Sequence, residues 1–221
     1  VRTIVVAGEP GGSIPATRKR VEEAWPGATV FDHHGMTEVG PVTYQCPAQA
    51  GVLHVLEEAY LPEIIDPKTA EPVAAGETGE LVLTTLGRHG SPLIRYRTGD
   101  IVTAAELPCP CGRLDLALRG GILGRSDDMV VVRGVNVYPS AVEEILRSAG
   151  GVAEYRVTIS RDDALIEMSV EVEPEIGDDS ALAKRLAKSF QETLALRVPV
   201  KLVEPGSLPR FELKAKRWIA N

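Results

Sequence analysis

The sequence lacks several features that define whole classes of proteins. No apolar run approaches the ~20 residues that span a bilayer, and the first residues, VRTIVVAGEP, have neither the cationic region nor the cleavage site of a signal peptide. Basic residues are scattered and the net charge is −7, which argues against a nucleic-acid surface. Only three cysteines are present, which favours a reducing compartment. We therefore expect a cytoplasmic protein with no membrane and no nucleic-acid partner.

Patterns of several enzyme and structural classes are absent as well. No Ser/His/Asp order or nucleophile elbow supports hydrolase chemistry, and neither a heptad run nor an internal repeat is present. The 221 residues are 44% hydrophobic, which excludes a disordered tail and allows a real core. The length predicts a globular chain of one or two domains.

The first part of the chain has an α/β pattern. A short apolar strand over residues 3–7 is followed by GEPGG, by a helix that ends near Trp25, and by a second strand over residues 28–31. Such a β-loop-α-β order predicts two parallel strands joined by a helix. From Gly51 onward, apolar runs of strand length alternate with turn signals, which predicts an antiparallel meander or small barrel.

A second unit is predicted to begin near Asp127, where the sequence is polar. Two short strands come first, and Ser140 with Glu143 matches a capping box that opens a helix. A hairpin, an amphipathic helix and a last strand, PVKLV, follow. We therefore expect a small α+β domain over residues 127–221, after an α/β domain over residues 1–126.

A polar segment, DHHGMTEVG, directly follows the second predicted strand. It contains two histidines, a threonine and a glutamate within seven residues. Open α/β sheets bind ligands at the carboxyl ends of their strands. The segment alone fits an ordinary polar loop, and its position makes it a candidate ligand site.

Six motifs occur along the chain in an order that resembles one family. They are VAGEP, DHHGMTE, GETGELVLTTL, PLIRYRTGD, GRSDDMVVVRGVNVYPSAVE and the terminal KAKR. Together they resemble the adenylate-forming enzymes, and most closely the phenylacetate–coenzyme A ligase branch. The resemblance covers essentially the whole chain but only the later part of such an enzyme, because the upstream Ser/Thr/Gly-rich phosphate loop is absent. We therefore expect a missing N-terminal part, as a separate chain or a lost segment.

The resemblance implies an ATP-dependent acid–coenzyme A ligase that forms an acyl adenylate and then an acyl-CoA thioester. The substrates would be ATP, coenzyme A and a carboxylic acid of the aryl or arylacetic type. Residues 1–126 would be the later portion of the large adenylation domain, and residues 127–221 a mobile lid that turns about Asp127. In the second pose Gly134 would leave room for a tunnel that admits coenzyme A.

The resemblance also assigns residues to the nucleotide. The nucleotide-binding positions are Gly8, Glu9, Pro10, Asp32, His34, Gly35, Asp100 and Arg125. His34 stands where the family usually has tyrosine; an imidazole can stack on adenine, but it titrates near neutral pH. The Asp100 carboxylate suits the two ribose hydroxyls, and the Arg125 guanidinium suits anionic oxygens near the ribose.

Three residues take catalytic roles by the same resemblance. Glu38 would hold Mg²⁺ and Thr37 would contact the α-phosphate. Lys214 would neutralise the charge that develops as pyrophosphate leaves, with Lys216 as the competing candidate.

The cysteines raise a separate possibility of a metal site. Cys46, His54, Cys109 and Cys111 come from segments that flank the predicted meander. Three thiolates and one imidazole could close a tetrahedral structural zinc site. The alternative is three unconnected free thiols and a histidine packed on a strand.

Two other functions stay open. One is an adenylating enzyme that passes its product to a different acceptor. The other is an inactive half-enzyme or nucleotide-binding module, since we expect the chain by itself to form no acyl-CoA without the phosphate loop. The TGD motif stands where the phenylacetate enzymes often carry TRD, so the acid itself is not specified. A homodimer is a further expectation.

Overall fold

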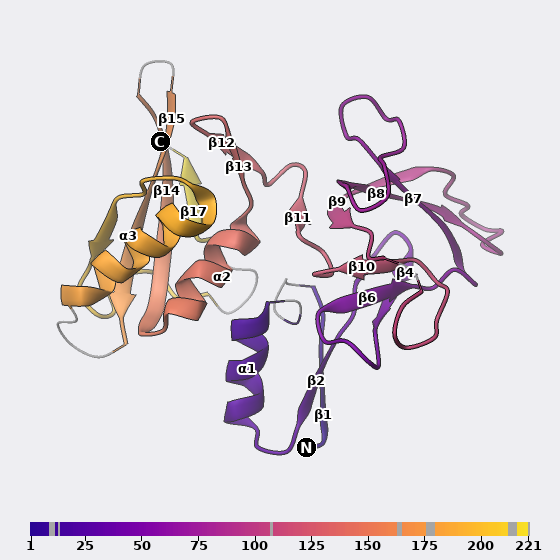
Figure 1. Cartoon of the computed structure of the whole chain (residues 1–221), viewed down its shortest axis with the longest axis horizontal. Helices are drawn as coiled ribbons and strands as arrows, with labels where there is room; N and C mark the ends of the chain where they lie inside the picture. The colour runs from indigo at the N-terminus through magenta and orange to yellow at the C-terminus, as the bar shows by residue number, and fades with distance from the viewer. Residues whose placement is uncertain are drawn as a thin grey trace. The chain divides into compact units, whose positions relative to one another are not determined.

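The computed structural model describes residues 1–8, 12, 14–106, 108–162, 165–175, 180–211 and 216–220. These residues form two compact units, Val1–Asp128 and Met129–Asn221 (Figure 1). Each unit is built around its own hydrophobic core. Within the described part of the chain, no helix combines the length and the apolar character needed to cross a membrane.

The first unit opens with the predicted β-loop-α-β order. Strand β1 (Thr3–Val6) runs parallel to β2 (Thr29–Asp32), and helix α1 (Pro15–Ala24) lies beside the pair (Figure 1). A proline opens α1, where its missing N–H costs no helical hydrogen bond. Val6 pairs with Asp32, so the segments that follow the two strands leave the same edge of the sheet.

Antiparallel strands make up the rest of this unit, which confirms the predicted meander. They are β3 (Gly35–Met36), β4 (Gly40–Pro41), β5 (Thr43–Gln45), β6 (Val52–Val55), β7 (Tyr60–Ile65), β8 (Thr78–Thr85), β9 (Tyr96–Thr103), β10 (Ala117–Arg119) and β11 (Gly124–Arg125). One sheet has the order β10-β6-β5, another has the order β11-β9-β8-β7, and β3 pairs with β4. Leu53, Leu81 and Val102 are among the fully buried residues that these strands contribute to the core.

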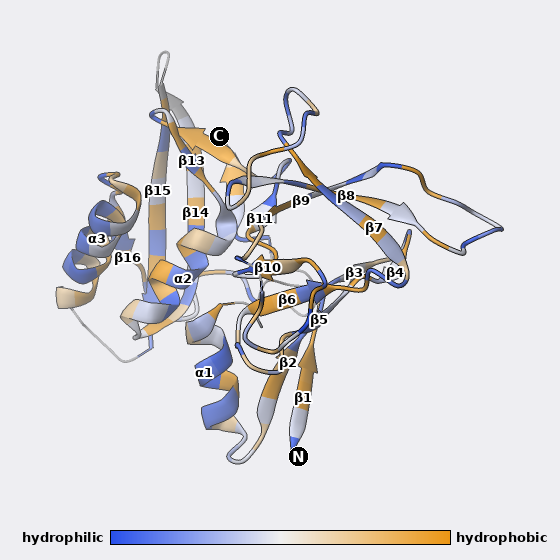
Figure 2. Cartoon of the chain, turned by 45° about the vertical axis from the view of Figure 1, so that its right-hand side comes forward, coloured by the Kyte–Doolittle hydropathy of each residue, from blue (hydrophilic) through white to orange (hydrophobic). Residues whose placement is uncertain are grey.

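The second unit is an α+β fold. Its elements are β12 (Val130–Val132), β13 (Val135–Val137), α2 (Pro139–Ala149), β14 (Val152–Asp162), β15 (Leu165–Pro174), α3 (Ser180–Leu194), β16 (Val200–Leu202) and β17 (Trp218–Ala220). The main sheet has the order β16-β15-β14-β17, and its two central strands form the predicted hairpin. Hydrophobic and hydrophilic residues alternate along β14 and β15 (Figure 2), so one face of this sheet joins the core. Leu182, Leu186 and Phe190 of α3 are fully buried in the same core.

The capping box predicted for α2 is wrong. The helix begins at Pro139, one residue before Ser140, and the N-cap residue Tyr138 makes no side-chain capping bond. Proline is favoured at the first helical position because its backbone angle is already helical. The Glu143 carboxylate instead accepts a hydrogen bond of 2.5 Å from the Tyr155 hydroxyl.

A buried glutamate anchors the segment that follows β16. Glu173, in β15, is fully buried, and its carboxylate accepts hydrogen bonds from the backbone N–H groups of Gly206 and Leu208. The Arg210 guanidinium lies 2.5 Å from the same carboxylate. The ion pair with Arg210, supported by the two backbone donors, holds the pKa of Glu173 at about 2 against the effect of burial.

A second buried glutamate anchors the last strand. Glu154, in β14, receives two hydrogen bonds from Arg217, of 2.6 and 3.2 Å. Burial opposes ionisation, but these bonds hold the pKa of Glu154 below its ordinary value. The Arg217 guanidinium also lies over the Tyr155 ring, 5.1 Å from its centre. Arg217 thus holds the last stretch of the chain next to β14, where β17 pairs with β14 in parallel. Sequence patterns did not predict β17.

The hydrogen bonds and ion pair of Glu173 predict that the second unit becomes less stable at acidic pH. Because the pKa is depressed in the folded state, the stabilisation is complete above the ordinary value near 4.5 and is lost as the pH falls toward about 2. Glu173→Gln should lower the free energy of unfolding at pH 7 by roughly 1–3 kcal/mol. The difference from the wild type should shrink steadily between pH 5 and pH 2.

Urea unfolding followed by Trp218 fluorescence, in a Trp25→Phe background, reports this unit alone. Glu175→Gln is the matched control because Glu175 is exposed and lies only two residues away. A stability difference for Glu173→Gln that stays constant between pH 7 and pH 3 would contradict the prediction.

Candidate functional site

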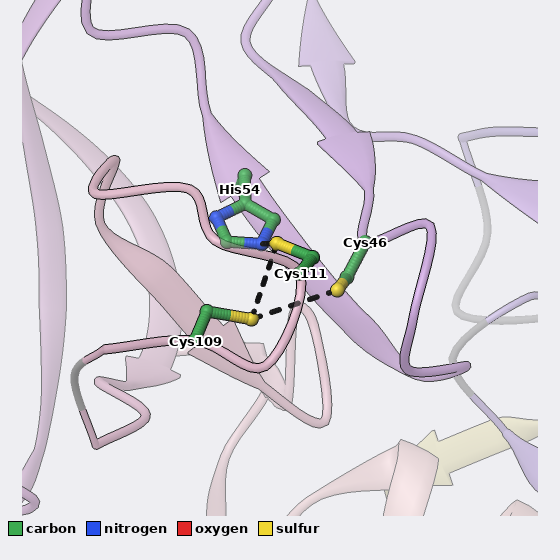
Figure 3. A group of neighbouring side chains, drawn as sticks. All are labelled: Cys46, His54, Cys109 and Cys111. Atoms are coloured by element: carbon green, nitrogen blue, oxygen red, sulfur yellow. Dashed lines mark hydrogen bonds between the residues drawn. The ribbon is translucent and has the colours of Figure 1, made fainter.

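Four potential metal ligands converge in the first unit (Figure 3). Cys46 directly follows β5, His54 lies in β6, and Cys109 and Cys111 lie on the loop before β10. The Cys46 and Cys109 sulfur atoms are 3.6 Å apart, and Cys111 Sγ lies 3.4 Å from Cys109 Sγ and 3.3 Å from His54 Nε2. All four donor atoms lie within 4.8 Å of one another. The structure therefore brings together the four residues that the sequence suggested as zinc ligands.

This geometry suits a small tetrahedral ion. Zinc–thiolate bonds of about 2.3 Å place neighbouring ligand atoms about 3.8 Å apart, close to the distances observed. Cys46, His54 and Cys109 are buried, with exposures of 1%, 0% and 4%. Four such ligands would close a tetrahedral coordination sphere, which is the pattern of structural rather than catalytic zinc sites.

The surroundings of His54 orient it for metal binding. His54 Nδ1 lies 3.2 Å from the Asp115 carbonyl oxygen, and donating to that oxygen leaves Nε2 free to face the thiols. The Tyr44 ring stacks on the imidazole with 5.4 Å between ring centres. The Tyr44 hydroxyl donates a 2.8 Å hydrogen bond to the Asp115 carboxylate, and burial together with this partner raises the pKa of Tyr44 to about 12.

The Cys111 thiol is placed to ionise. Burial alone would raise its pKa, but a hydrogen bond from the Arg113 backbone N–H and the neighbouring Cys109 and Cys46 thiols hold the pKa of Cys111 below its ordinary value. A thiolate is the form that binds a metal. These partners, Tyr44, Asp115 and the Arg113 N–H, have no pattern in the sequence that marks them.

A second group of polar residues surrounds Asp100. Asp100 lies in β9 and is 4% exposed, and its Oδ2 lies 3.0 Å from His34 Nε2. That contact is not aligned as a hydrogen bond, so both buried atoms lack a hydrogen-bond partner among the described residues. Buried polar atoms are nearly always satisfied by hydrogen bonds, whereas these two have a contact with each other but no aligned hydrogen bond among the described residues.

Arg125 completes this group from β11. Its Nη1 lies 3.5 Å from Asp100 Oδ1 and donates to the Thr98 carbonyl at 3.2 Å. Its other nitrogens form two hydrogen bonds with Asp127, of 2.8 and 3.1 Å. Gly99 lies against the guanidinium with φ of +78°, and a Cβ there would come within 2.8 Å of Nη2. Only glycine fits between β9 and Arg125 in this conformation.

Side chains of β5 hold the segment that carries His34. The Thr43 hydroxyl accepts a 2.8 Å hydrogen bond from the His34 N–H, and the Gln45 side-chain oxygen accepts one of 3.1 Å from the Asp32 N–H. The buried Arg18 guanidinium of α1 also donates to the Gln45 side chain. It donates as well to the carbonyl oxygens of Val30 in β2 and of Gly12, which precedes α1. Sequence reasoning identified Asp32 and His34 but missed Thr43, Gln45 and Arg18, whose partners lie far away in the chain.

The remaining predicted residues lie in different settings. Gly8 follows β1 with φ of +83°, while Glu9 and Pro10 lie outside the described residues. Gly35 begins the β3–β4 hairpin, where a Cβ would approach the Gly40 carbonyl to 2.7 Å.

Of the three predicted catalytic residues, Thr37 and Glu38 fall within the described part of the chain. Thr37 and Glu38 lie in the turn between β3 and β4 with exposed side chains. Lys214 lies outside the described residues, whereas Lys216 is described and exposed. In the second unit Gly134 lies between β12 and β13 with φ of +83°.

Comparisons with known proteins agree on one family. The model of the AMP-binding enzyme C-terminal domain matches residues 134–221. Phenylacetate-coenzyme A ligase of Thermus thermophilus is 36% identical over 219 residues, covering 89% of this chain and 49% of the relative. The Escherichia coli enzyme of the same name is 34% identical, covering 91% of this chain and 47% of the relative.

A solved structure gives the same result for the fold. 2-Hydroxyisobutyryl-CoA ligase, in the postadenylation state with 2-HIB-AMP, matches with a TM-score of 0.90 and 33% identity, over 100% of this chain and 48% of that one. The chain thus spans about half the length of the relatives it matches. The chain belongs to the adenylate-forming enzymes and is related to the phenylacetate–coenzyme A ligases.

Proposed function

We propose that the protein to which this chain belongs is a cytoplasmic, ATP-dependent acid–coenzyme A ligase. In this reaction a carboxylate oxygen attacks the α-phosphorus of ATP and pyrophosphate leaves. The coenzyme A thiol then attacks the acyl carbonyl and AMP leaves, with the thiol proton passing to solvent. The observation that carries the proposal is the group of His34 and Arg125 around the buried Asp100, in a chain 33–36% identical to phenylacetate-coenzyme A ligases.

The unpaired atoms of the Asp100 group support a nucleotide site. Ribose hydroxyls would donate to the Asp100 carboxylate, whose Oδ2 has no hydrogen-bond partner among the described residues. The His34 imidazole beside it would face the adenine, and Arg125 would add positive charge near the phosphates. Arg125 already forms an ion pair with Asp127, so in this proposal its positive charge would act on both the Asp127 carboxylate and the nucleotide.

The turn that carries Thr37 and Glu38 would serve the phosphates. An exposed carboxylate fits Mg²⁺, which keeps several waters and takes only one or two protein oxygens. When bound, Mg²⁺ would neutralise charge on the phosphate oxygens. In this proposal Glu38 supplies the protein oxygen and Thr37 contacts the α-phosphate.

The second unit would act as the mobile lid. We place the hinge at Asp127, with Lys214 acting in adenylation and Gly134 lining the path of coenzyme A. A ligase 31–33% identical to this chain is described in postadenylation, open and thioesterification states, which supports alternation between poses. The acid would be of the aryl or arylacetic class, and a homodimer is the assembly we propose.

The Cys46, His54, Cys109 and Cys111 cluster supports a bound Zn²⁺. Three sulfurs and one imidazole nitrogen are the ligand types that favour zinc in a tetrahedral site. The ion would neutralise buried thiolates and fix the loop before β10 to β5 and β6. It would be structural and take no part in either half-reaction.

The lysine assignment predicts a split between the two half-reactions in the full-length protein. Lys214→Ala should lower the rate of acyl-adenylate formation by roughly 10²–10³-fold, because a charge that stabilises the transition state is lost. Acyl-CoA formation from a preformed acyl adenylate should stay near the wild-type rate.

Pyrophosphate exchange and single-turnover thioester assays measure the two steps separately, and Lys216→Ala is the matched control. Equal loss of both steps in Lys214→Ala, or the split appearing in Lys216→Ala instead, would refute the assignment. Pyrophosphate exchange without any consumption of coenzyme A would identify a different acceptor.

The metal assignment predicts one zinc ion per chain. Elemental analysis of the purified protein should give a stoichiometry near one, and Cys111→Ser should abolish it while His89→Ala, at an exposed histidine, keeps it. Zinc removal by a chelator should lower the Tm, since metal binding stabilises the folded state. Metal-free protein with an unchanged Tm would leave the free-thiol interpretation standing.

A further inference from the structure

We propose that the metal centre sets the position of the nucleotide segment, residues 32–35, through strand β5. The proposal rests on the zinc and nucleotide assignments above and adds a coupling between them. The metal would not touch the nucleotide. It would hold the strand whose side chains hold Asp32 and His34.

Strand β5 is short, and among the described strands it pairs with β6 alone. It contains three residues and forms the edge of the sheet with order β10-β6-β5. Its backbone pairs with β6 over three positions, which include Tyr44 opposite His54. Such a short edge strand has few ladder hydrogen bonds, so contacts at its ends contribute much of its positioning.

One set of β5 side chains contacts the nucleotide segment. Thr43 and Gln45 are 3% and 9% exposed, and they accept hydrogen bonds from the His34 and Asp32 N–H groups. The backbone N–H of Thr43 also donates to the His34 carbonyl at 3.0 Å. His34 is therefore bound to β5 through both its N–H and its carbonyl group.

The other contacts of β5 lead to the metal ligands. Tyr44, on the opposite side of the strand from Thr43 and Gln45, stacks on His54 and donates to Asp115. Cys46 follows the strand directly, and its backbone N–H donates to the Val52 carbonyl at 2.8 Å. A metal bound by Cys46 would tie the end of β5 to β6 and to the loop before β10.

Loss of the metal would release the end of β5. The Cys46 sulfur would lose its bond to an ion shared with Cys109, Cys111 and His54, and thiolates that repel one another would remain. Movement of β5 would displace the Thr43 and Gln45 acceptors and with them His34, whose Nε2 faces Asp100 at 3.0 Å. Allosteric coupling between sites commonly changes affinity by 5–150-fold, and we expect about tenfold here.

The experiment compares zinc-loaded and zinc-free full-length protein, with zinc removed by a chelator and restored afterwards. AMP affinity by calorimetry should fall about tenfold without zinc and recover on its return. Amide hydrogen exchange of residues 32–45 should become faster without zinc, while exchange in β7 and β8 stays unchanged. Unchanged exchange in residues 32–45, or purified protein that holds no zinc, overturns the proposal.

A double-mutant cycle separates coupling from general destabilisation. Thr43→Val removes the hydroxyl that holds His34 but keeps the metal ligands, so zinc should remain bound and AMP affinity should fall. In the Thr43→Val background, zinc removal should then change AMP affinity by a smaller factor than in the wild type, because one of the links from β5 to His34 is already lost. Additive effects would show that zinc acts by another route.

The hydrogen-exchange measurement tests the coupling independently of the nucleotide assignment. A protein that binds no AMP but shows zinc-dependent exchange in residues 32–45 would refute the nucleotide assignment and keep the coupling. A protein that binds AMP with zinc-independent affinity and exchange would refute the coupling alone.

Discussion

The structure depends on how carboxylates are accommodated inside two small sheets. A carboxylate removed from water must recover its lost hydration from donors in the protein. Glu80 in β8 does so with Arg97 and the Gly99 N–H, and Glu173 does so with Arg210 and two backbone N–H groups. The donors come from segments distant in sequence, so each buried charge fixes the path of a second stretch of chain. Asp100 differs, because one of its oxygens is left without a hydrogen-bond partner among the described residues.

That difference distinguishes carboxylates that stabilise the fold from a carboxylate that is available to a ligand. The glutamates of the second unit are saturated by arginines and serve as fixed points for the segments that follow β16. In the Asp100 group one carboxylate oxygen lacks a hydrogen-bond partner among the described residues, and the cysteine cluster brings together four side chains that could hold a metal ion. Both features lie in the first unit, and both are built on strands that are only two to eight residues long.

Much of this fold could be predicted from the sequence because its signals are local. Apolar runs and turn residues identified the β-loop-α-β unit, the meander and the β14–β15 hairpin. The four candidate metal ligands could be singled out because cysteine and histidine are rare and chemically distinctive. The start of α2 was missed because a capping box and an N-terminal proline compete over one residue. Strand β17 and the roles of Thr43, Gln45 and Arg18 could not be predicted, since they depend on contacts between distant segments with no periodic pattern.

Gly99 and Arg125 also restrict how this site can evolve. The left-handed backbone at Gly99 and the guanidinium beside it occupy the volume that any side chain would need. A larger residue at position 99, such as the arginine that the resemblance gives for many phenylacetate enzymes, could be accepted only with a changed backbone and a displaced residue 125. A substitution at position 99 therefore requires both a changed backbone and a shift of the Arg125 side chain, whereas Gly99 places no such restriction on residue 125.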